Sequence, residues 1–67
     1  MNARCPICNN PIGYMCPHDI GKYRVYYYSD NVVTVWAGKY PNNKRILRID
    51  RLVLLDEERI EKLLLLQ

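Results

Sequence analysis

The stretch Cys5-Pro6-Ile7-Cys8, followed after seven residues by Cys16-Pro17-His18, decides how this chain can fold. It holds all three cysteines and the only histidine of the 67-residue chain. A core built from so short a chain seldom contributes more than about 3–5 kcal/mol, so a metal, a disulfide or a partner chain is expected to stabilise it. Three thiols and one imidazole match the ligand set of a closed structural zinc site. We therefore expect one structural Zn²⁺ held by Cys5, Cys8, Cys16 and His18.

The spacing of these residues suits a single metal centre. A C-x-x-C turn directs both sulfur atoms toward one point, and Asn9 and Asn10 after it belong to the non-glycine residue type that best tolerates a positive φ. Cys16 and His18 are two residues apart, so in an extended segment their side chains lie on one face. If His18 is not a ligand, Asp19 or a group from another molecule would have to complete the site.

The pattern C-x2-C-x7-C-x-H over residues 5–18 resembles the loops of zinc ribbons and short zinc fingers. It departs from the zinc-ribbon pattern at the second pair, where C-x-x-C is usual. The resemblance implies a structural metal and covers only this loop. Two other interpretations are open. One is a redox dithiol of Cys5 and Cys8, which would need a helix N-terminus beside a βαβ unit, and the other is three unrelated thiols.

The cysteine count also indicates the compartment. An odd number leaves one thiol over in an intramolecular disulfide framework, and residues 1–20 contain no continuous apolar core of a signal peptide. The longest apolar runs, 52–55 and 63–66, are much shorter than the roughly 20 residues needed to cross a bilayer. We therefore expect a cytoplasmic protein without a membrane partner.

Residues 22–37 are predicted to form a β-hairpin. The segments 23–28 and 32–37 are dense in β-branched and aromatic residues, and Ser29-Asp30-Asn31 between them is a turn signal. Residues 38–43 form a second loop, and residues 45–49 are expected to be a third strand beside the hairpin. Residues 4–19 are rich in Cys, Pro and Asn, which predicts turns rather than regular structure.

Residues 57–66 are predicted to form a C-terminal helix. Asp56 is a good N-cap, Glu57 and Glu58 lie where the helix dipole favours anions, and Lys62 follows Glu58 at i,i+4. An alternative helix over residues 51–66 would place the acidic residues mid-helix. We prefer the shorter helix, with residues 52–55 as a strand or a buried entry segment. The fold class is α+β: a small zinc-stapled domain, residues 1–67, with an antiparallel β-hairpin extended to three strands and a C-terminal helix.

A three-residue loop at 29–31 sorts the hairpin side chains onto two faces. The predicted core face consists of Tyr23, Val25, Tyr27, Val33 and Val35. The other face places Arg24 opposite Trp36, with Tyr26 and Tyr28 beside them, as either a self-satisfied cation–π surface or a docking face. With a two-residue loop, the side chains would be distributed differently between the two faces. The tyrosines could also serve only to fill the volume of a small sheet, without a role in binding.

Charge is unevenly distributed along the chain. Residues 1–48 carry +5 and residues 49–67 carry −2, within a total of +3. Lys44 and Arg45, with Lys39 and Arg48 nearby, could extend the aromatic face into a basic surface. Single-stranded nucleic acids are commonly held by aromatic rings interleaved with Lys and Arg, so nucleic-acid binding is an alternative function.

The C-terminal leucines exceed what one buried helix face requires. Ile60, Leu63 and Leu64 share a face, whereas Leu65 and Leu66 point elsewhere and mark either a protein interface or a frayed last turn. We expect a non-catalytic module that binds a foreign protein or a second copy of the chain through the helix or the aromatic hairpin, with no small-molecule substrate. The chain has no Ser/His/Asp set, phosphate-binding glycine loop or spare histidine to support an enzyme. In size and organisation it also resembles accessory proteins that phages and other mobile elements use to bind host machinery.

Overall fold

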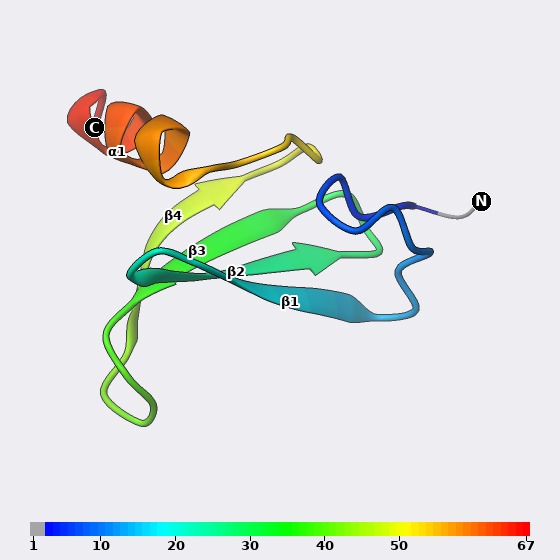
Figure 1. Ribbon diagram of the computed structural model, residues 1–67, viewed down its shortest axis with the longest axis horizontal. Coiled ribbons are helices and arrows are strands. Elements are labelled where there is room, and N and C mark those ends of the chain that lie inside the picture. The colour runs from blue at the N-terminus through cyan, green and yellow to red at the C-terminus, as the bar shows by residue number, and fades with distance from the viewer. Residues whose placement is uncertain (1–2) are drawn as a thin grey trace.

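The computed structural model describes residues 3–67 as a four-stranded antiparallel sheet followed by a helix (Figure 1). In chain order the elements are β1 (Met15–Ile20), β2 (Tyr23–Tyr28), β3 (Val33–Ala37), β4 (Lys44–Ile49) and α1 (Glu57–Leu65). The strands pair in the order β1-β2-β3-β4, so each strand lies beside its neighbour in the chain. The architecture is α+β, with four strands where the sequence predicts three.

The additional strand is β1, in a segment whose composition predicts turns. Residues 15–20 pair with all of β2 in antiparallel register. The two residues Gly21 and Lys22 join the strands, and Gly21 adopts a φ of 58°, which glycine does without steric cost. Pro17 is tolerated because β1 lies at the edge of the sheet, where one side of the strand needs no ladder hydrogen bonds.

The β2–β3 hairpin has the three-residue loop that the sequence favours. Tyr28 donates its N–H to the carbonyl of Val32 over 2.8 Å, and Arg24 lies opposite Trp36. The predicted third strand is β4, which begins one residue earlier than expected, at Lys44. A β-bulge shifts the register between β3 and β4 near the middle of their pairing.

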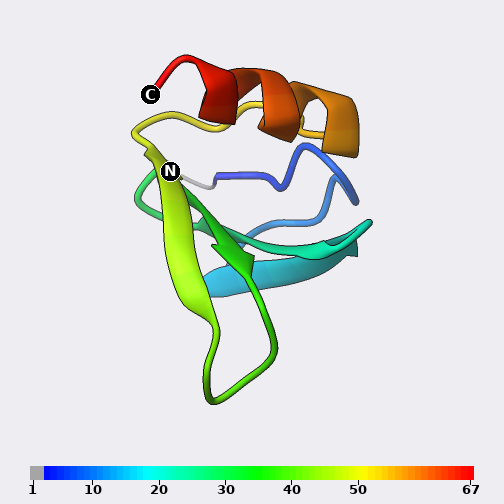
Figure 2. The ribbon, with the colours of Figure 1, turned by 90° about the vertical axis from the view of Figure 1, so that its left-hand side faces the viewer.

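One face of the sheet is covered and forms the core. Its buried side chains from the hairpin are Tyr23, Val25, Tyr27, Val33 and Val35, the set that the three-residue loop predicts. Leu47, Leu55, Ile60, Cys5 and Ile12 complete the cluster of buried hydrophobic residues. Figure 1 and Figure 2 show that α1 and the N-terminal segment lie on the same side of the sheet, α1 toward one end of the strands and the N-terminal segment toward the other. The cysteine-containing turn therefore lies over the covered face, with Cys5 buried and Ile7, Asn9 and Asn10 exposed.

Helix α1 begins at its predicted residue and ends one residue early. Asp56 caps it by accepting the N–H of Arg59 at 2.7 Å, and Lys62 pairs with Glu58 at 3.4 Å. The alternative helix over 51–66 is wrong, because residues 51–55 form no helix and no strand. They are an irregular connection whose last residue, Leu55, is buried. No helix within residues 3–67 has the length and apolar character required to span a bilayer.

Candidate metal centre and open sheet face

The N-terminal segment folds into a tight turn that presents Cys5 and Cys8. Asn9 donates its N–H to the carbonyl of Cys5 at 2.8 Å, and Cys5 donates its own to the carbonyl of Asn10 at 3.0 Å. Asn9 adopts a φ of 63°, the left-handed conformation expected after a C-x-x-C turn. Arg4 donates from Nη1 to the carbonyl of Asn9 at 2.9 Å. The turn is followed by a strand, so the redox-dithiol interpretation lacks the helix N-terminus that it needs.

Strand β1 supplies the other two candidate ligand atoms, the sulfur of Cys16 and a ring nitrogen of His18. Cys16 lies opposite Tyr27 and His18 lies opposite Val25, so both share the covered face with these fully buried residues. The His18 ring also meets the Tyr27 ring edge to face, with centroids 6.2 Å apart. The two-residue alternation of a strand therefore brings Cys16 and His18 to one face, beneath the N-terminal turn.

The four candidate ligand atoms form a compact cluster in which all lie within 4.8 Å of one another. The Sγ atoms of Cys5 and Cys16 are 3.1 and 3.3 Å from Nε2 of His18, and the Sγ atoms of Cys8 and Cys16 are 3.6 Å apart. Tetrahedral zinc, with Zn–S of about 2.3 Å and Zn–N of about 2.0–2.1 Å, implies edges of about 3.8 Å between sulfurs and about 3.6 Å between sulfur and nitrogen. These three distances are within about 0.5 Å of the tetrahedral values, and the other distances in the cluster do not exceed 4.8 Å. The cluster could therefore hold a metal ion.

Burial and mutual repulsion govern the charge of the thiols. Cys5 is buried, and Cys8, Cys16 and His18 are half-buried. Burial, with the neighbouring Cys8 and Cys5, raises the pKa of Cys16 to about 12, whereas the backbone N–H of Asn10 holds the pKa of Cys8 below its usual value. Three thiolates this close repel one another, so deprotonating all three requires a cation between them. A divalent metal ion bound at this cluster would supply that charge and would replace the thiol protons.

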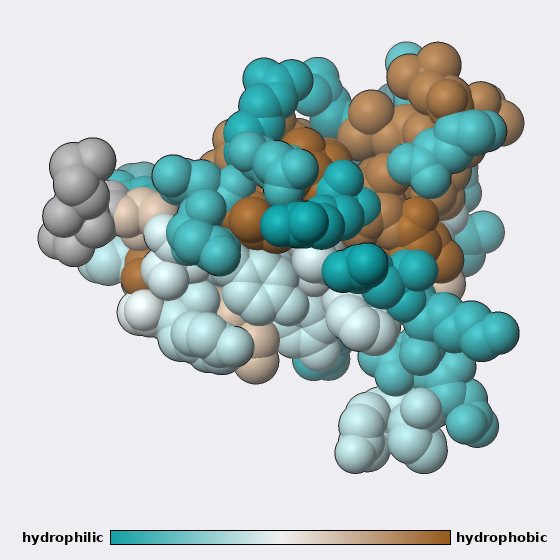
Figure 3. Space-filling model, turned by 180° about the vertical axis from the view of Figure 1, so that it is seen from behind, coloured by the Kyte–Doolittle hydropathy of each residue, from teal (hydrophilic) through white to brown (hydrophobic). Residues whose placement is uncertain are grey.

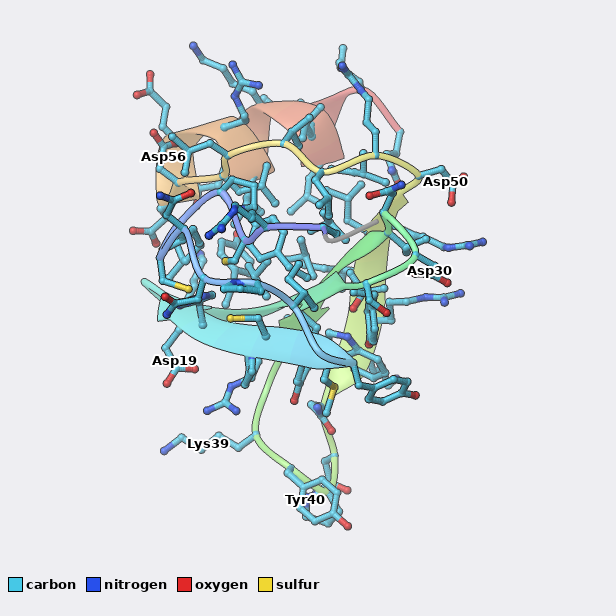
Figure 4. The ribbon with its side chains drawn as sticks, turned by 90° about the vertical axis from the view of Figure 1, so that its right-hand side faces the viewer. Asp19, Asp30, Lys39, Tyr40, Asp50 and Asp56 are labelled. Atoms are coloured by element: carbon cyan, nitrogen blue, oxygen red, sulfur yellow. The ribbon has the colours of Figure 1, made fainter. Side chains whose placement is uncertain are left out.

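The opposite face of the sheet, which we call the open face, lies away from α1 and the N-terminal segment (Figure 4). Its strand residues are Met15, Pro17, Asp19, Arg24, Tyr26, Tyr28, Thr34, Trp36, Arg45 and Arg48. Asp19 points to this face and pairs with Arg24, with Nε and Oδ1 2.7 Å apart. Asp19 is therefore not the fourth member of the thiol cluster, and His18 takes that place.

Four aromatic rings cross the open face as a continuous row, here called the ring row. Tyr14 and Tyr28 have ring centroids 6.4 Å apart, Tyr28 and Tyr26 are 6.3 Å apart, and Tyr26 and Trp36 are also 6.3 Å apart. Tyr14 is 74% exposed, and the other three are half-buried. Tyr14 is not among the residues predicted for this face, because it directly precedes β1, a strand that the sequence pattern does not predict.

Polar contacts hold the rings in place by their edges. Trp36 donates from Nε1 to Oγ1 of Thr34 at 3.0 Å, and the Thr34 hydroxyl donates to the Tyr28 hydroxyl at 3.3 Å. Thr34 itself is buried at 5% exposure. Arg24 turns to Asp19 rather than to the ring of Trp36, and this ion pair raises the pKa of Arg24. Of the two alternatives for this face, the cation–π pair of Arg24 and Trp36 is therefore not formed within residues 3–67.

Two hollows lie at the ends of the ring row. One has a volume of about 1070 Å³ and includes the β3–β4 loop, residues 38–43, which projects away from α1 (Figures 1 and 4). The other has a volume of about 380 Å³ and lies beside the β2–β3 turn. Cationic side chains border both hollows, each beside one carboxylate: Arg24 and Lys39 line the first with Asp19, and Arg45 and Arg48 line the second with Asp30.

The predicted partner-binding residues fall into three places. Arg24, Tyr26, Tyr28, Trp36 and Arg45 lie on the open face. Lys44 does not, because it precedes Arg45 in the strand and lies opposite Ala37, so alternation directs it to the other side. Leu65 and Leu66, at the end of α1, are 83% and 82% exposed. Figure 3 shows the most hydrophobic surface at this helical end of the molecule, away from the projecting loop.

Comparisons with protein-family models, with curated proteins and with solved structures found no significant match. The function proposed below therefore rests on the geometry of the thiol cluster and of the open face.

Proposed function

We propose that this chain is a non-catalytic binding module, stabilised by one structural Zn²⁺, that binds its partner through the open face. The observation that carries the proposal is the division of the chain's chemistry between the two sides of one sheet. Three thiols and the only imidazole cluster on the covered side, whereas rings and cations gather on the other. The metal would stabilise the fold, and the open face would contact the partner.

The ligand set supports a structural role for the metal. Three sulfurs and one nitrogen fill all four positions of a tetrahedral site, which leaves none for a reacting water molecule. A metal held by Cys5 and Cys8 from the turn and by Cys16 and His18 from β1 would tie the N-terminal segment to the sheet. A chain that uses every thiol as a metal ligand suits a reducing compartment, and we place it in the cytoplasm.

Cobalt substitution tests the ligand set. Co²⁺ in a Cys₃His tetrahedron gives strong visible absorption together with a thiolate-to-metal charge-transfer band. We expect His18→Asn to weaken or shift these bands, and the matched variant Asp19→Asn to leave them unchanged, because Asp19 lies on the opposite face. Bands that respond to Asp19→Asn but not to His18→Asn would contradict the proposed ligands.

Partner capture tests the open face. The protein is immobilised, and the proteins and nucleic acids that it retains from a cell lysate are measured with and without nuclease treatment of the lysate. We expect Tyr26→Leu and Arg45→Gln to reduce the amount retained. The control Arg59→Gln removes the same charge from an exposed position in α1, on the covered side of the sheet. Equal capture by all three variants and the wild type would contradict binding through the open face.

The exposed leucines support a protein partner at a second surface. Leu54, in the connection before the helix, is also exposed, at 60%. Exposed apolar groups of this kind mark protein interfaces or self-association. Sedimentation velocity tests a homodimer here: the double variant Leu65→Glu and Leu66→Glu should sediment as a monomer at concentrations where the wild type associates. A monomeric wild type would rule the homodimer out.

A further inference from the structure

Given the proposed role of the open face, we infer that its ligand is a single-stranded nucleic acid. Bases would stack on the rings of Tyr26, Tyr28 and Trp36, and phosphates would be held by Arg45 and Arg48 at one end and by Lys39 at the other. This inference names the partner class and rests on the proposed function.

The ring row has the properties of a stacking platform. Its ring centroids are spaced at 6.3–6.4 Å from Tyr14 to Trp36, and the rings are half-buried or exposed rather than enclosed in the core. Tyr26 and Tyr28 are tilted by 30° to each other, whereas Trp36 meets Tyr26 at 86° and Tyr14 meets Tyr28 at 78°, so a strand would stack its bases on ring faces that point in different directions. The hydroxyl of Thr34 fixes the edges of Trp36 and Tyr28. Because these rings are already ordered, a stacked base would cost little additional side-chain entropy. Every base has a π face, so such a row would accept single strands of varied sequence.

The distribution of charge favours a polyanion on this side of the molecule. Arg45 and Lys39 form no ion pair within residues 3–67, so their charges are free for phosphate. Arg48 is 3.1 Å from Asp50, but more than half of its side chain is exposed. The acidic residues of α1 lie on the covered side, where Glu57 and Glu58 begin the helix. A phosphate chain would therefore be attracted to the open face and repelled from the helix.

The shape of the surface favours single strands over duplexes. Reading a duplex in its major groove requires a helix or a β-ribbon that enters the groove. The helix of the described chain, α1, begins with acidic residues, which phosphates repel. A duplex also keeps its bases stacked on each other, so they could not reach the ring row. An acidic protein segment would meet the cations but would give the rings no flat partner.

Oligonucleotide titration of the intact zinc-loaded protein tests the inference. The probes are oligo-dT and oligo-rU of about 12 nucleotides, a duplex of the same length and poly-glutamate, at about 50 mM salt. Trp36 is the only tryptophan in the chain, so quenching of its fluorescence reports contact with the ring row. We expect the single strands to bind more tightly than the duplex or poly-glutamate, with quenching.

Three variants separate stacking from general attraction. Tyr26→Leu should weaken single-strand binding by about 5- to 140-fold, whereas Tyr26→Phe, which keeps the ring, should change it little. Arg45→Gln should flatten the slope of log affinity against log salt by about 0.7, the value for one phosphate contact with a single strand. Arg59→Gln, with the same charge change on α1, should leave that slope unchanged. Zinc content and circular dichroism confirm that each variant is folded.

Four other results of these titrations would overturn the inference of a single-stranded nucleic acid. Absence of single-strand binding by the folded protein would do so, as would tighter binding of the duplex. If Arg45→Gln and Arg59→Gln changed single-strand affinity equally, and the fluorescence of Trp36 were not quenched, the binding would be general charge attraction only. Tighter binding of poly-glutamate, abolished by Arg45→Gln, would exclude a nucleic acid but leave the proposed role of the open face intact. The proposed function itself fails only if open-face variants leave every captured partner unchanged.

Discussion

Removing the hydroxyl group of Tyr27 tests how the sheet holds the connection that precedes the helix. The ring is fully buried, and its hydroxyl donates to the carbonyl of Val53 at 2.9 Å and accepts the N–H of Leu55 at 3.2 Å. Tyr27→Phe removes both hydrogen bonds and leaves the buried N–H of Leu55 without a partner. A lost hydrogen bond costs about 1 kcal/mol, and an unsatisfied buried group costs about 1–3 kcal/mol. We expect the free energy of unfolding to fall by about 2–4 kcal/mol.

Urea denaturation at saturating zinc, followed by circular dichroism, measures this change. The matched control is Tyr40→Phe, whose ring is 89% exposed on the projecting loop and should change stability by less than about 0.5 kcal/mol. For a domain of this size, the Tyr27 variant should also melt roughly 10–20 °C lower. A stability loss below about 0.5 kcal/mol for Tyr27→Phe would refute the role assigned to its hydroxyl.

The buried hydroxyl of Tyr27 should also make the stability of the fold depend on pH. Burial raises the pKa of Tyr27 to about 12, above the value of about 10 for an unfolded tyrosine. The fold therefore favours the neutral phenol, so this contribution to stability is complete below about pH 10 and is lost as the pH rises toward 12. Urea midpoints measured between about pH 9 and 12 should fall more steeply for the wild type than for Tyr27→Phe. Parallel curves would contradict the burial of the neutral hydroxyl.

Two further predictions concern the backbone at element ends. Gly21→Ala should cost about 1–2 kcal/mol, because Gly21 has a positive φ and an added Cβ would meet the carboxyl group of Glu57 at 2.5 Å. Gly13→Ala, where a Cβ meets nothing within 4 Å, is the matched control and should be neutral or slightly stabilising in the same urea titration. Asp56→Ala should cost about 1 kcal/mol through loss of the N-cap, and Asp56→Asn should recover most of it; equal losses in thermal unfolding would contradict the capping role.

Local chemistry made most of the hairpin and helix predictable. The turn signal at 29–31 fixed a register in which Arg24 meets Trp36, and alternation then assigned Val25 and Val35 to the core. Asp56 marked the start of the helix because its carboxylate satisfies a free N–H of the first turn. These features depend on residues close together in the chain, so the sequence pattern contains the required information.

The parts that could not be predicted depend on contacts between distant segments. Strand β1 contains Pro17 between Cys16 and His18, a composition with low β-propensity. Pairing with the whole length of β2 overrides this low propensity. Without β1, the sequence could not reveal that Tyr14 joins the ring row. Lys44 and Arg45 are neighbours in β4 and point to opposite faces, and which of them meets the rings follows from the register of β4 with β3, which a bulge shifts.

The central claim is that one zinc ion, bound by Cys5, Cys8, Cys16 and His18, holds this small fold together. Its most direct test is the metal content and thermal unfolding of one purified sample, measured before and after chelation. Structural zinc in such loops contributes about 10–16 kcal/mol of apparent folding free energy, comparable to the whole stability of an ordinary domain. We predict one zinc per chain and a cooperative transition that is lost on chelation and restored by Zn²⁺. A metal-free chain with an unchanged transition would contradict the claim.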